Sequence, residues 1–357
     1  MAEILYKRGE DEFASAMSPS TAYSSTPPKI TPASREGDAN YKAPIFPIGP
    51  FTKYEQNPLL VPNPKNEFES GYIYNAAAIV LDDTIFLLYR AQNPQLKSSV
   101  GLAWSTDGFN FTRLDRPVLE ASEPWEAGGG VEDPRIARFD GVFYMTYTSW
   151  DFKTPRLCLA TSTDLVHWEK RPPLFPNMKD VEFNSEGRTL YREGHSKSGA
   201  IFPEKNAEGR YVMIFGDSHL YLAESDDLLN WTAKPFSEHF AAPTLAWESR
   251  LLEPGPAPVK TRDGKWILVY NAATLGTARY RNNQYSISQM LIDYQHLENG
   301  PVARLDQPSV VVSAQNEREG LVNEVVFTEG MVQFKGQWFL YFGQADSELG
   351  VATAPVN

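Results

Sequence analysis

The sequence predicts an all-β protein, a five-bladed β-propeller with an extended N-terminal arm, and three observations carry this prediction. Apolar runs of strand length recur from about Phe46 onward, whereas helical periodicity over ten or more residues is hard to find. These runs pair around tight turns, and one segment is repeated along the chain. The composition agrees, because 13% aromatic residues with 24 Gly and 27 Pro are typical of many short strands.

The N-terminal part of the chain does not share this pattern. From position 13 to 45 it is rich in Ser, Thr, Pro and Ala, with almost no periodic apolar residues. We therefore expect a flexible or strap-like arm over residues 1–45 and a propeller over residues 46–357. The alternative is an arm that lies along a partner subunit in a homo-oligomer, and composition does not decide between the two.

Hairpins are predicted where two apolar runs flank a short polar turn. The turns are Asp82-Asp83 within 76–90, Asp140-Gly141 within 135–150 and Lys335-Gly336 within 330–346. Segments 210–225 and 265–274 add further strands.

The repeat predicts the architecture. Segment 101–111 recurs as 158–168 and as 221–231, and a degenerate copy closes the chain at 349–354. The aligned Asp107, Asp164 and Asp227 are 57 and 63 residues apart, which is enough for four strands each. In each copy we expect the apolar triplet to be a strand, Ser-x-Asp to begin a tight turn, and the last aromatic residue to pack back. Roughly 60 residues per unit gives five blades, whose inner strands converge on a central channel.

Composition and charge exclude several classes of function. A net charge of −12 disfavours nucleic acid or an anionic membrane as partner. No apolar run approaches the roughly 18 residues of a membrane span, and the N-terminus lacks a secretory signal, so we expect a cytoplasmic protein. Cys158 is the single cysteine, and the five histidines lack the paired spacing of a zinc site, so no metal or cofactor is expected.

The most informative segment for chemistry is Gly128–Ile136, in which three glycines precede Glu132-Asp133-Pro134-Arg135. Neighbouring side chains on an extended strand point to opposite faces, so at most one of the two carboxylates should face the channel. A turn with a salt-bridged arginine would explain the segment equally well. A site is favoured because polar residues sit at similar strand ends of other blades: Asn75, Arg90, Glu253, Glu329 and Asp346.

A family resemblance follows from motifs in matching order along more than four-fifths of the chain. The motifs are Asn57–Leu60, Tyr74–Ala77, Leu88–Arg90, Gly130–Arg135, Tyr147-Thr148, Ser225–Leu228 with Trp231, Gly255–Pro258, Asn323–Gly330 and Tyr341–Asp346. The chain resembles glycoside hydrolase family 130, five-bladed propellers that act on β-mannosides.

The resemblance implies roles for individual residues. Asp133 matches the general acid, which in family members protonates the glycosidic oxygen through the mannosyl 3-hydroxyl in an inverting reaction. Asn75, Arg90 and Asp346 match positions that hold hydroxyls of the −1 sugar, and Arg135 is grouped with these substrate-binding residues. The alternative for them is a buried network that ties the blades together.

The family contains phosphorylases and hydrolases, and the sequence departs from the phosphorylase pattern. Asn271 stands where phosphorylases carry a histidine, Asp217 stands near an expected arginine and would repel phosphate, and Glu253 replaces a small residue. Lys197 and Arg250 remain as candidate phosphate ligands.

We therefore expect an inverting hydrolase of β-1,2- or β-1,4-linked manno-oligosaccharides. It needs a carboxylate base roughly 6.5–9.5 Å from the acid. Glu253 is the first choice, and Glu329 and Glu324 are the alternatives. A β-mannoside phosphorylase releasing mannose 1-phosphate and a non-catalytic sugar-binding propeller are the competing readings.

Overall fold

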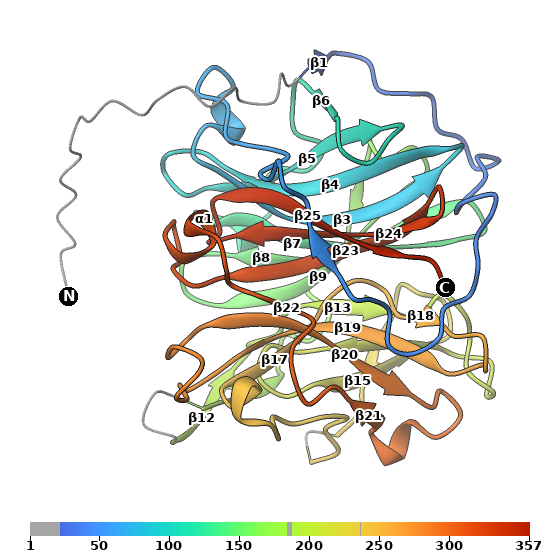
Figure 1. Ribbon diagram of the computed structural model, residues 1–357, viewed down its shortest axis with the longest axis vertical. Helices are drawn as coiled ribbons and strands as arrows, with labels where there is room; N and C mark the ends of the chain where they lie inside the picture. The colour runs from blue at the N-terminus through green and yellow to red at the C-terminus, as the bar shows by residue number, and fades with distance from the viewer. Residues whose placement is uncertain (1–21, 184–187, 236) are drawn as a thin grey trace, which may run out of the picture.

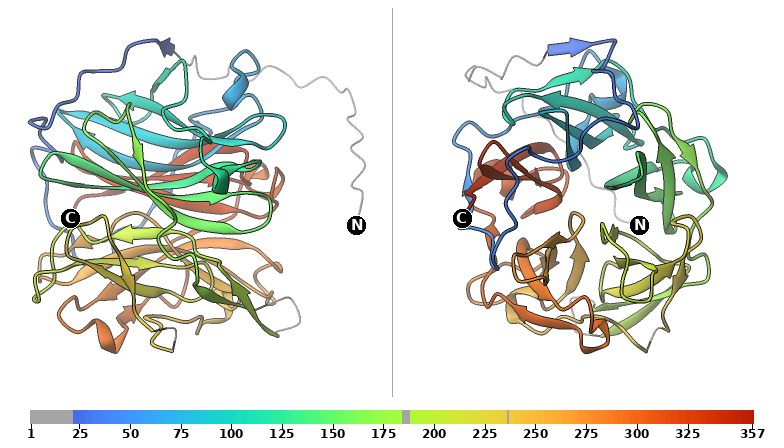
Figure 2. Two further views of the ribbon diagram at one scale, coloured as in Figure 1. Left: turned by 180° about the vertical axis from the view of Figure 1, so that it is seen from behind. Right: turned by 90° about the vertical axis from the view of Figure 1, so that its right-hand side faces the viewer.

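The computed structural model describes residues 22–183, 188–235 and 237–357. These residues form an all-β, five-bladed propeller, as the sequence predicted (Figure 1). The right-hand view of Figure 2 looks along the common axis, around which the blades are arranged.

Each blade runs from an inner to an outer strand through antiparallel neighbours. The first blade contains β3 (Tyr72–Leu81), β4 (Thr84–Gln92), β5 (Ser98–Ser105) and β6 (Thr112–Leu114). The second contains β7 (Gly130–Phe139), β8 (Val142–Trp150), β9 (Pro155–Ser162) and β10 (Glu169–Lys170). The third contains β13 (Gly199–Ile201), β14 (Tyr211–Phe215), β15 (Tyr221–Ser225) and β16 (Thr232–Ala233).

The fourth blade contains β17 (Leu251–Pro254), β18 (Val259–Lys260), β19 (Trp266–Ala273), β20 (Tyr285–Ile292), β21 (Pro301–Arg304) and β22 (Val310–Val311). The fifth combines β23 (Val326–Phe334), β24 (Gln337–Gln344) and β25 (Glu348–Pro355) with β2 (Thr52–Lys53). Since β2 precedes the first blade in sequence, its pairing with β25 joins the last blade to the beginning of the ring.

Short elements connect or flank the blades. They are β1 (Ala22–Ser24), the hairpin of β11 (Lys179–Phe183) and β12 (Thr189–Glu193), the 3-10 helices η1 (Glu67–Glu69), η2 (Pro124–Glu126), η3 (Ala246–Glu248) and η4 (Leu297–Asn299), and the helix α1 (Gln315–Arg318). Within the described residues, none of the helices is long and apolar enough to cross a membrane.

The predicted hairpins are present and have the backbone that their turns require. Asp82 and Asp83 join β3 to β4 with φ of 46° and 59°. Asp140-Gly141 joins β7 to β8 and Lys335-Gly336 joins β23 to β24, again with positive φ at both positions. Two positive φ values match the right-handed twist of the strands, which explains Asp and Gly at these turns.

The repeated segment also folds as predicted. In each of the three complete copies the serine hydroxyl accepts a backbone N–H three residues later, and the aspartate accepts from the residues that follow it. The closing Trp168 and Trp231 pack back and donate Nε1–H to the carbonyls of Leu165 and Leu228, both at 3.0 Å.

A second repeat was missed in the sequence. A fully buried glutamate in a short helix before an inner strand pairs with a cation on the outer strand of the same blade. The pairs are Glu69–Arg113 (3.2 Å), Glu126–Lys170 (2.6 Å), Glu248–Arg304 (2.7 Å) and Glu317–Lys53 (2.6 Å). Tyrosine hydroxyls also donate to the first three glutamates, from Tyr89, Tyr147 and Tyr270. These pairs satisfy buried charges and attach each helix to its blade.

The described part of the N-terminal arm lies against the ends of inner strands. Arg138 of β7 donates to the carbonyl of Ser34 at 2.7 Å, and Gln333 of β23 exchanges two hydrogen bonds with the backbone of Lys42. The arm, including Tyr41, borders a cavity of about 340 Å³ together with residues from all five described blades. This cavity lies where the inner strands finish. We call the end of the propeller where the inner strands finish the finish end. The opposite end, where these strands begin, is called the start end.

Candidate active site

Backbone irregularities at the start end turn polar side chains out of the pleat. Register shifts occur at Asn75 in β3, between Glu132 and Arg135 in β7, and at Glu329 in β23. Asn75 and Asp133 have φ of 47° and 54°, a conformation that Asn and Asp tolerate better than most residues. The bulges thus place functional groups from three blades at equivalent depths.

Asp133 is the centre of this cluster. Its Oδ1 accepts from Asn75 Nδ2 at 3.0 Å and from Arg90 Nη1 at 2.9 Å, and its Oδ2 lies 3.3 Å from Lys197 Nζ. The side chain is only 3% exposed. Burial alone would raise the pKa of Asp133, but Arg90, Lys197 and the Asn75 hydrogen bond hold it well below its usual range.

The expectation that only one of the two neighbouring carboxylates would face the channel needs correction. Arg90 Nη2 pairs with Glu132 at 2.6 Å while Nη1 pairs with Asp133, so both carboxylates contact one guanidinium. The bulge after Glu132 breaks the alternation that an ideal strand would impose. Arg90 also stacks on Tyr74, at 4.7 Å from the ring centroid, and is thereby fixed in place.

Glu253 lies on the other side of Lys197. Lys197 Nζ is 3.9 Å from Glu253 Oε1, which also accepts a short hydrogen bond from the Ser198 hydroxyl. Since one ammonium lies 3.3 Å from Asp133 and 3.9 Å from Glu253, these two carboxylates are at most about 7 Å apart. This limit reaches only the lower end of the roughly 6.5–9.5 Å that separates an inverting pair. Burial raises the pKa of Glu253 despite the cations beside it.

Arg135, expected to bind substrate, is buried at 2% exposure beneath the cluster. It donates to the carbonyls of Pro254, Gly255 and Asp133, and its Nη1 lies 3.2 Å from Glu329. It therefore connects three blades below the site. Burial raises the pKa of Glu329 well above its usual range, although Arg135 opposes the shift.

The remaining predicted residues surround this cluster. Glu324 pairs with Arg281, and Arg318 lies 3.8 Å away, at the beginning of the fifth blade. Asp346 has a left-handed backbone, and burial raises its pKa to about 7. Arg250 precedes β17, and its charge acts on Tyr285, whose pKa burial raises to about 12. The Oδ1 of Asn75 is buried without a hydrogen-bond partner in the described structure, so it is available to a ligand hydroxyl.

Asp217 does not stand as the uncompensated charge that the sequence suggested. Arg192 on β12 pairs with it through both nitrogens, at 2.5 and 3.3 Å, and also contacts His195 Nε2 at 3.1 Å. Burial lowers the pKa of His195 to about 4, so the ring is neutral at pH 7. Sequence reasoning missed Arg192 and His195 because the hairpin that carries Arg192 belongs to no repeat.

Asn271, which we expected at the position of a phosphorylase histidine, makes structural hydrogen bonds. It donates to the carbonyl of Thr328 at 2.9 Å and accepts from the Thr328 N–H at 2.8 Å, which ties β19 to β23.

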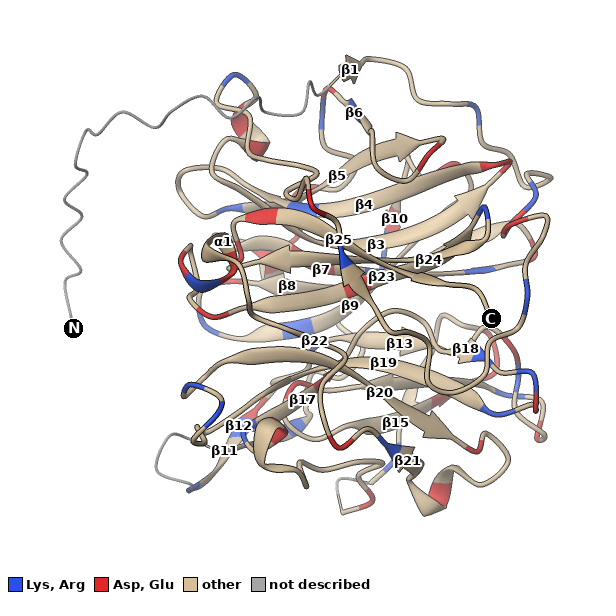
Figure 3. Cartoon of the chain, viewed as in Figure 1, with Lys and Arg blue, Asp and Glu red and all other residues tan. Residues whose placement is uncertain are grey.

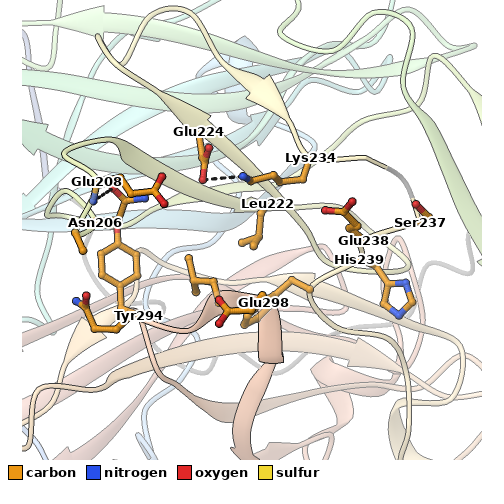
Figure 4. Close-up of a pocket in the computed structure, with 14 residues that line it drawn as sticks. Asn206, Glu208, Leu222, Glu224, Lys234, Ser237, Glu238, His239, Tyr294 and Glu298 are labelled. Atoms are coloured by element: carbon orange, nitrogen blue, oxygen red, sulfur yellow. Dashed lines mark hydrogen bonds and ion pairs between the residues drawn. The ribbon is translucent and has the colours of Figure 1, made fainter.

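Positively and negatively charged residues occur near α1 and near β12, on the left of the view in Figure 3. Among the described residues, no group of three or more His, Cys, Asp or Glu side chains is arranged to hold a metal ion. A larger cavity of about 580 Å³ lies beside the third and fourth blades, lined by Glu208, Lys234, His239 and Tyr294 among others (Figure 4). It contains none of the predicted site residues.

Known proteins are similar to this chain in sequence and in fold. Residues 48–357 match the family model of glycoside hydrolase family 130, described as β-1,4-mannooligosaccharide phosphorylase. A 1,2-β-oligomannan phosphorylase of Thermoanaerobacter sp. (strain X514) is 34% identical over 312 residues, covering 84% of this chain and 95% of the relative. A β-1,2-mannobiose phosphorylase of the same organism is 32% identical, covering 85% and 96%.

Solved structures give a similar result. A putative glycosidase of Bacteroides thetaiotaomicron has 30% identity and a TM-score of 0.76, with coverage of 85% of this chain and 96% of that one. A structure from work on family members that hydrolyse β-1,2 mannosidic linkages in Candida mannan has 32% identity and a TM-score of 0.76, with coverage of 88% and 99%.

Proposed function

We propose that this chain, which belongs to glycoside hydrolase family 130, is an inverting phosphorylase of β-1,2-linked mannosides. The family match and the similar phosphorylases support an enzyme that acts on β-mannosides. The β-1,2 linkage and the use of phosphate are carried over from the Thermoanaerobacter phosphorylases, which are similar over nearly their full length.

One observation in the site supports phosphate as the nucleophile. Lys197 faces Asp133 from the third blade, and the Arg192–Asp217 pair removes the repulsion that Asp217 alone would exert. The charges of Arg250 and Lys197 both act on Tyr285, so these two cations are close enough to one ring to suit an anion between them. Burial raises the pKa of Glu253, while Lys197 and Arg135 oppose the shift.

The geometry suggests how the groups act together. A phosphate oxygen attacks the anomeric carbon while the glycosidic bond breaks, and the leaving oxygen receives the proton that Asp133 supplies. Mannose 1-phosphate and a shortened mannoside result. Asp133 must first hold a proton, yet Lys197 favours its anionic form. A phosphate that draws Lys197 toward itself would raise the pKa of Asp133, so binding of the nucleophile prepares the acid.

A hydrolase is the second candidate, and Glu253 favours it. This buried carboxylate shares Lys197 with Asp133 and lies at most about 7 Å from it, a limit that reaches the lower end of the separation of an inverting acid and base. A solved relative at 32% identity comes from work on hydrolases of β-1,2 mannosidic linkages.

The products distinguish the two candidates. We would incubate the protein with β-1,2-mannobiose, with and without phosphate, and measure mannose 1-phosphate and free mannose. Phosphorolysis requires phosphate and should survive Glu253→Gln in part. Release of free mannose at the same rate without phosphate, abolished in Glu253→Gln, would establish the hydrolase instead.

A further inference from the structure

Two aromatic residues stand at the start end, on the same blade as the expected acid. Trp150 ends β8 and pairs with Gly130 of β7, three residues before Asp133. Phe152 follows in the loop and is 57% exposed, which is high for a phenylalanine. Trp150 is paired with Gly130, and three residues at a rise of about 3.4 Å each separate Gly130 from Asp133 by roughly 10 Å along the strand. That separation exceeds a single sugar ring.

The glycine loop before β7 makes room for these rings. A Cβ on Gly128 would lie 2.6 Å from the Phe152 ring, and one on Gly129 would lie 2.0 Å from the Trp150 ring. Both glycines are therefore needed for the rings to lie against the backbone. The two rings meet edge to face, with centroids 6.4 Å apart at 79°.

The loop that carries Phe152 is held in a costly conformation. Phe152 has φ of 63°, which is unfavourable for a bulky side chain. Asp151 fixes the loop, because its Oδ1 accepts from the N–H groups of Lys153 and Thr154 and its Oδ2 pairs with Arg156 at 2.9 Å. A strained backbone that exposes an apolar ring, held by several bonds, is a feature of binding sites.

We propose that Phe152, supported by Trp150, is a stacking surface for a mannosyl unit on the leaving-group side of the cleaved bond. Asp133 protonates the leaving oxygen, so the leaving chain passes over the blade that carries Asp133, and this blade presents the ring. The apolar face of a sugar suits an exposed aromatic ring. The proposal rests on the proposed function and deepens it: the preferred substrates are oligosaccharides of three or more units.

The test is a ratio of specificities. We would measure kcat/KM for β-1,2-linked mannobiose and mannotriose with wild-type protein and Phe152→Asn, since asparagine tolerates the positive φ but lacks the ring. We expect wild type to prefer the trisaccharide, and Phe152→Asn to lower the trisaccharide-to-disaccharide ratio by up to about tenfold. Phe152→Tyr should keep the ratio. Tyr41→Ala removes an aromatic ring that is 47% exposed, at the finish end, and is the matched control.

An unchanged ratio in Phe152→Asn would overturn the proposal. So would a ratio that falls equally in Tyr41→Ala. Product identity decides phosphorylase against hydrolase separately, and the ratio applies to either reaction. Binding of mannotriose to wild type and Phe152→Asn by calorimetry gives the same answer without turnover, because loss of the ring should weaken binding of the trisaccharide more than of the disaccharide.

Discussion

Lys197 Nζ lies 3.3 Å from Oδ2 of Asp133 and thereby joins the third blade to the expected acid of the second. The same ammonium is 3.9 Å from Glu253 on the fourth blade. Burial would lower the pKa of Lys197, but the surrounding carboxylates, Glu253 first, raise it above its usual range. Lys197 is therefore a positive charge in contact with two carboxylates, and an anionic nucleophile that binds Lys197 must compete with them.

Asp133→Asn should remove most activity and leave the fold intact. Asparagine tolerates the left-handed backbone at this position and can still accept from Asn75 and Arg90, but it cannot supply a proton. We expect turnover to fall by about 10²–10⁴-fold, measured with saturating substrate and phosphate. An unchanged circular dichroism spectrum would confirm folding, and turnover near the wild-type level would contradict the assignment of the acid.

Lys197→Met should weaken the use of phosphate more than the binding of sugar. Loss of one charged hydrogen bond to a phosphate should raise the KM for phosphate by roughly 10–100-fold. The pKa of Asp133 should also move upward, because a cation that stabilises its anionic form is gone. Initial rates at varied phosphate and pH measure both effects. Lys260→Met, which removes an exposed pair with Glu204, is the control. An unaltered KM for phosphate would count against this role.

Arg192 and Asp217 should behave as a unit. Arg192→Ala removes the charge that compensates Asp217, so we expect a higher KM for phosphate. Asp217→Asn in the same protein should restore part of the loss, since the repulsion disappears with it. The double-mutant cycle is read from KM for phosphate. Independent, additive effects would show that Asp217 does not act on the bound anion.

Much of the fold could be predicted because its signals are local. Asp82-Asp83 and Asp140-Gly141 mark turns by their own backbone preferences, and Ser225-x-Asp227 makes its bonds within five residues. The sequence also contains a local signal for the buried glutamates of the short helices. Glu126 and Glu248 both follow a tryptophan shortly before an inner strand, yet only their distant cations reveal the role.

The site was predicted less completely because its geometry depends on distant segments. The bulge that turns both Glu132 and Asp133 toward Arg90 leaves no pattern in the short motif Gly130–Arg135. The Arg192–Asp217 pair joins a hairpin outside the repeat to the end of β14, so Asp217 looked like a bare charge in sequence. Asn75, Arg90 and Asp133, which the resemblance assigned to one site, are in contact in the structure, and their roles in that site stay predictions.

Asp346 should make substrate binding depend on pH near neutrality. Burial raises its pKa to about 7, while Arg90 opposes that shift and Asp133 adds to it. Below this pH the carboxyl group is protonated and accepts hydroxyl hydrogen bonds poorly, and above it the carboxylate accepts them well. The KM for oligosaccharide should therefore fall as the pH rises through 7. In Asp346→Asn it should be higher and nearly flat, and a flat profile in wild type would contradict the assignment.

Lys53→Met should destabilise the ring at the point where it is joined. Lys53 on β2 pairs with the fully buried Glu317 at 2.6 Å, and burial lowers its own pKa while Glu317 opposes the shift. Removing the lysine leaves a buried carboxylate with less compensation, at a cost of about 3–5 kcal/mol in the free energy of unfolding. Denaturant unfolding measures this free energy.

The exposed Lys260–Glu204 pair is the matched control, and Lys260→Met should cost at most about 1 kcal/mol. Replacing both partners, Lys53→Met with Glu317→Leu, should recover much of the loss, because no buried charge then remains at the junction. If Lys53→Met costs no more than Lys260→Met, the junction is held by the β2–β25 backbone pairing and not by this ion pair.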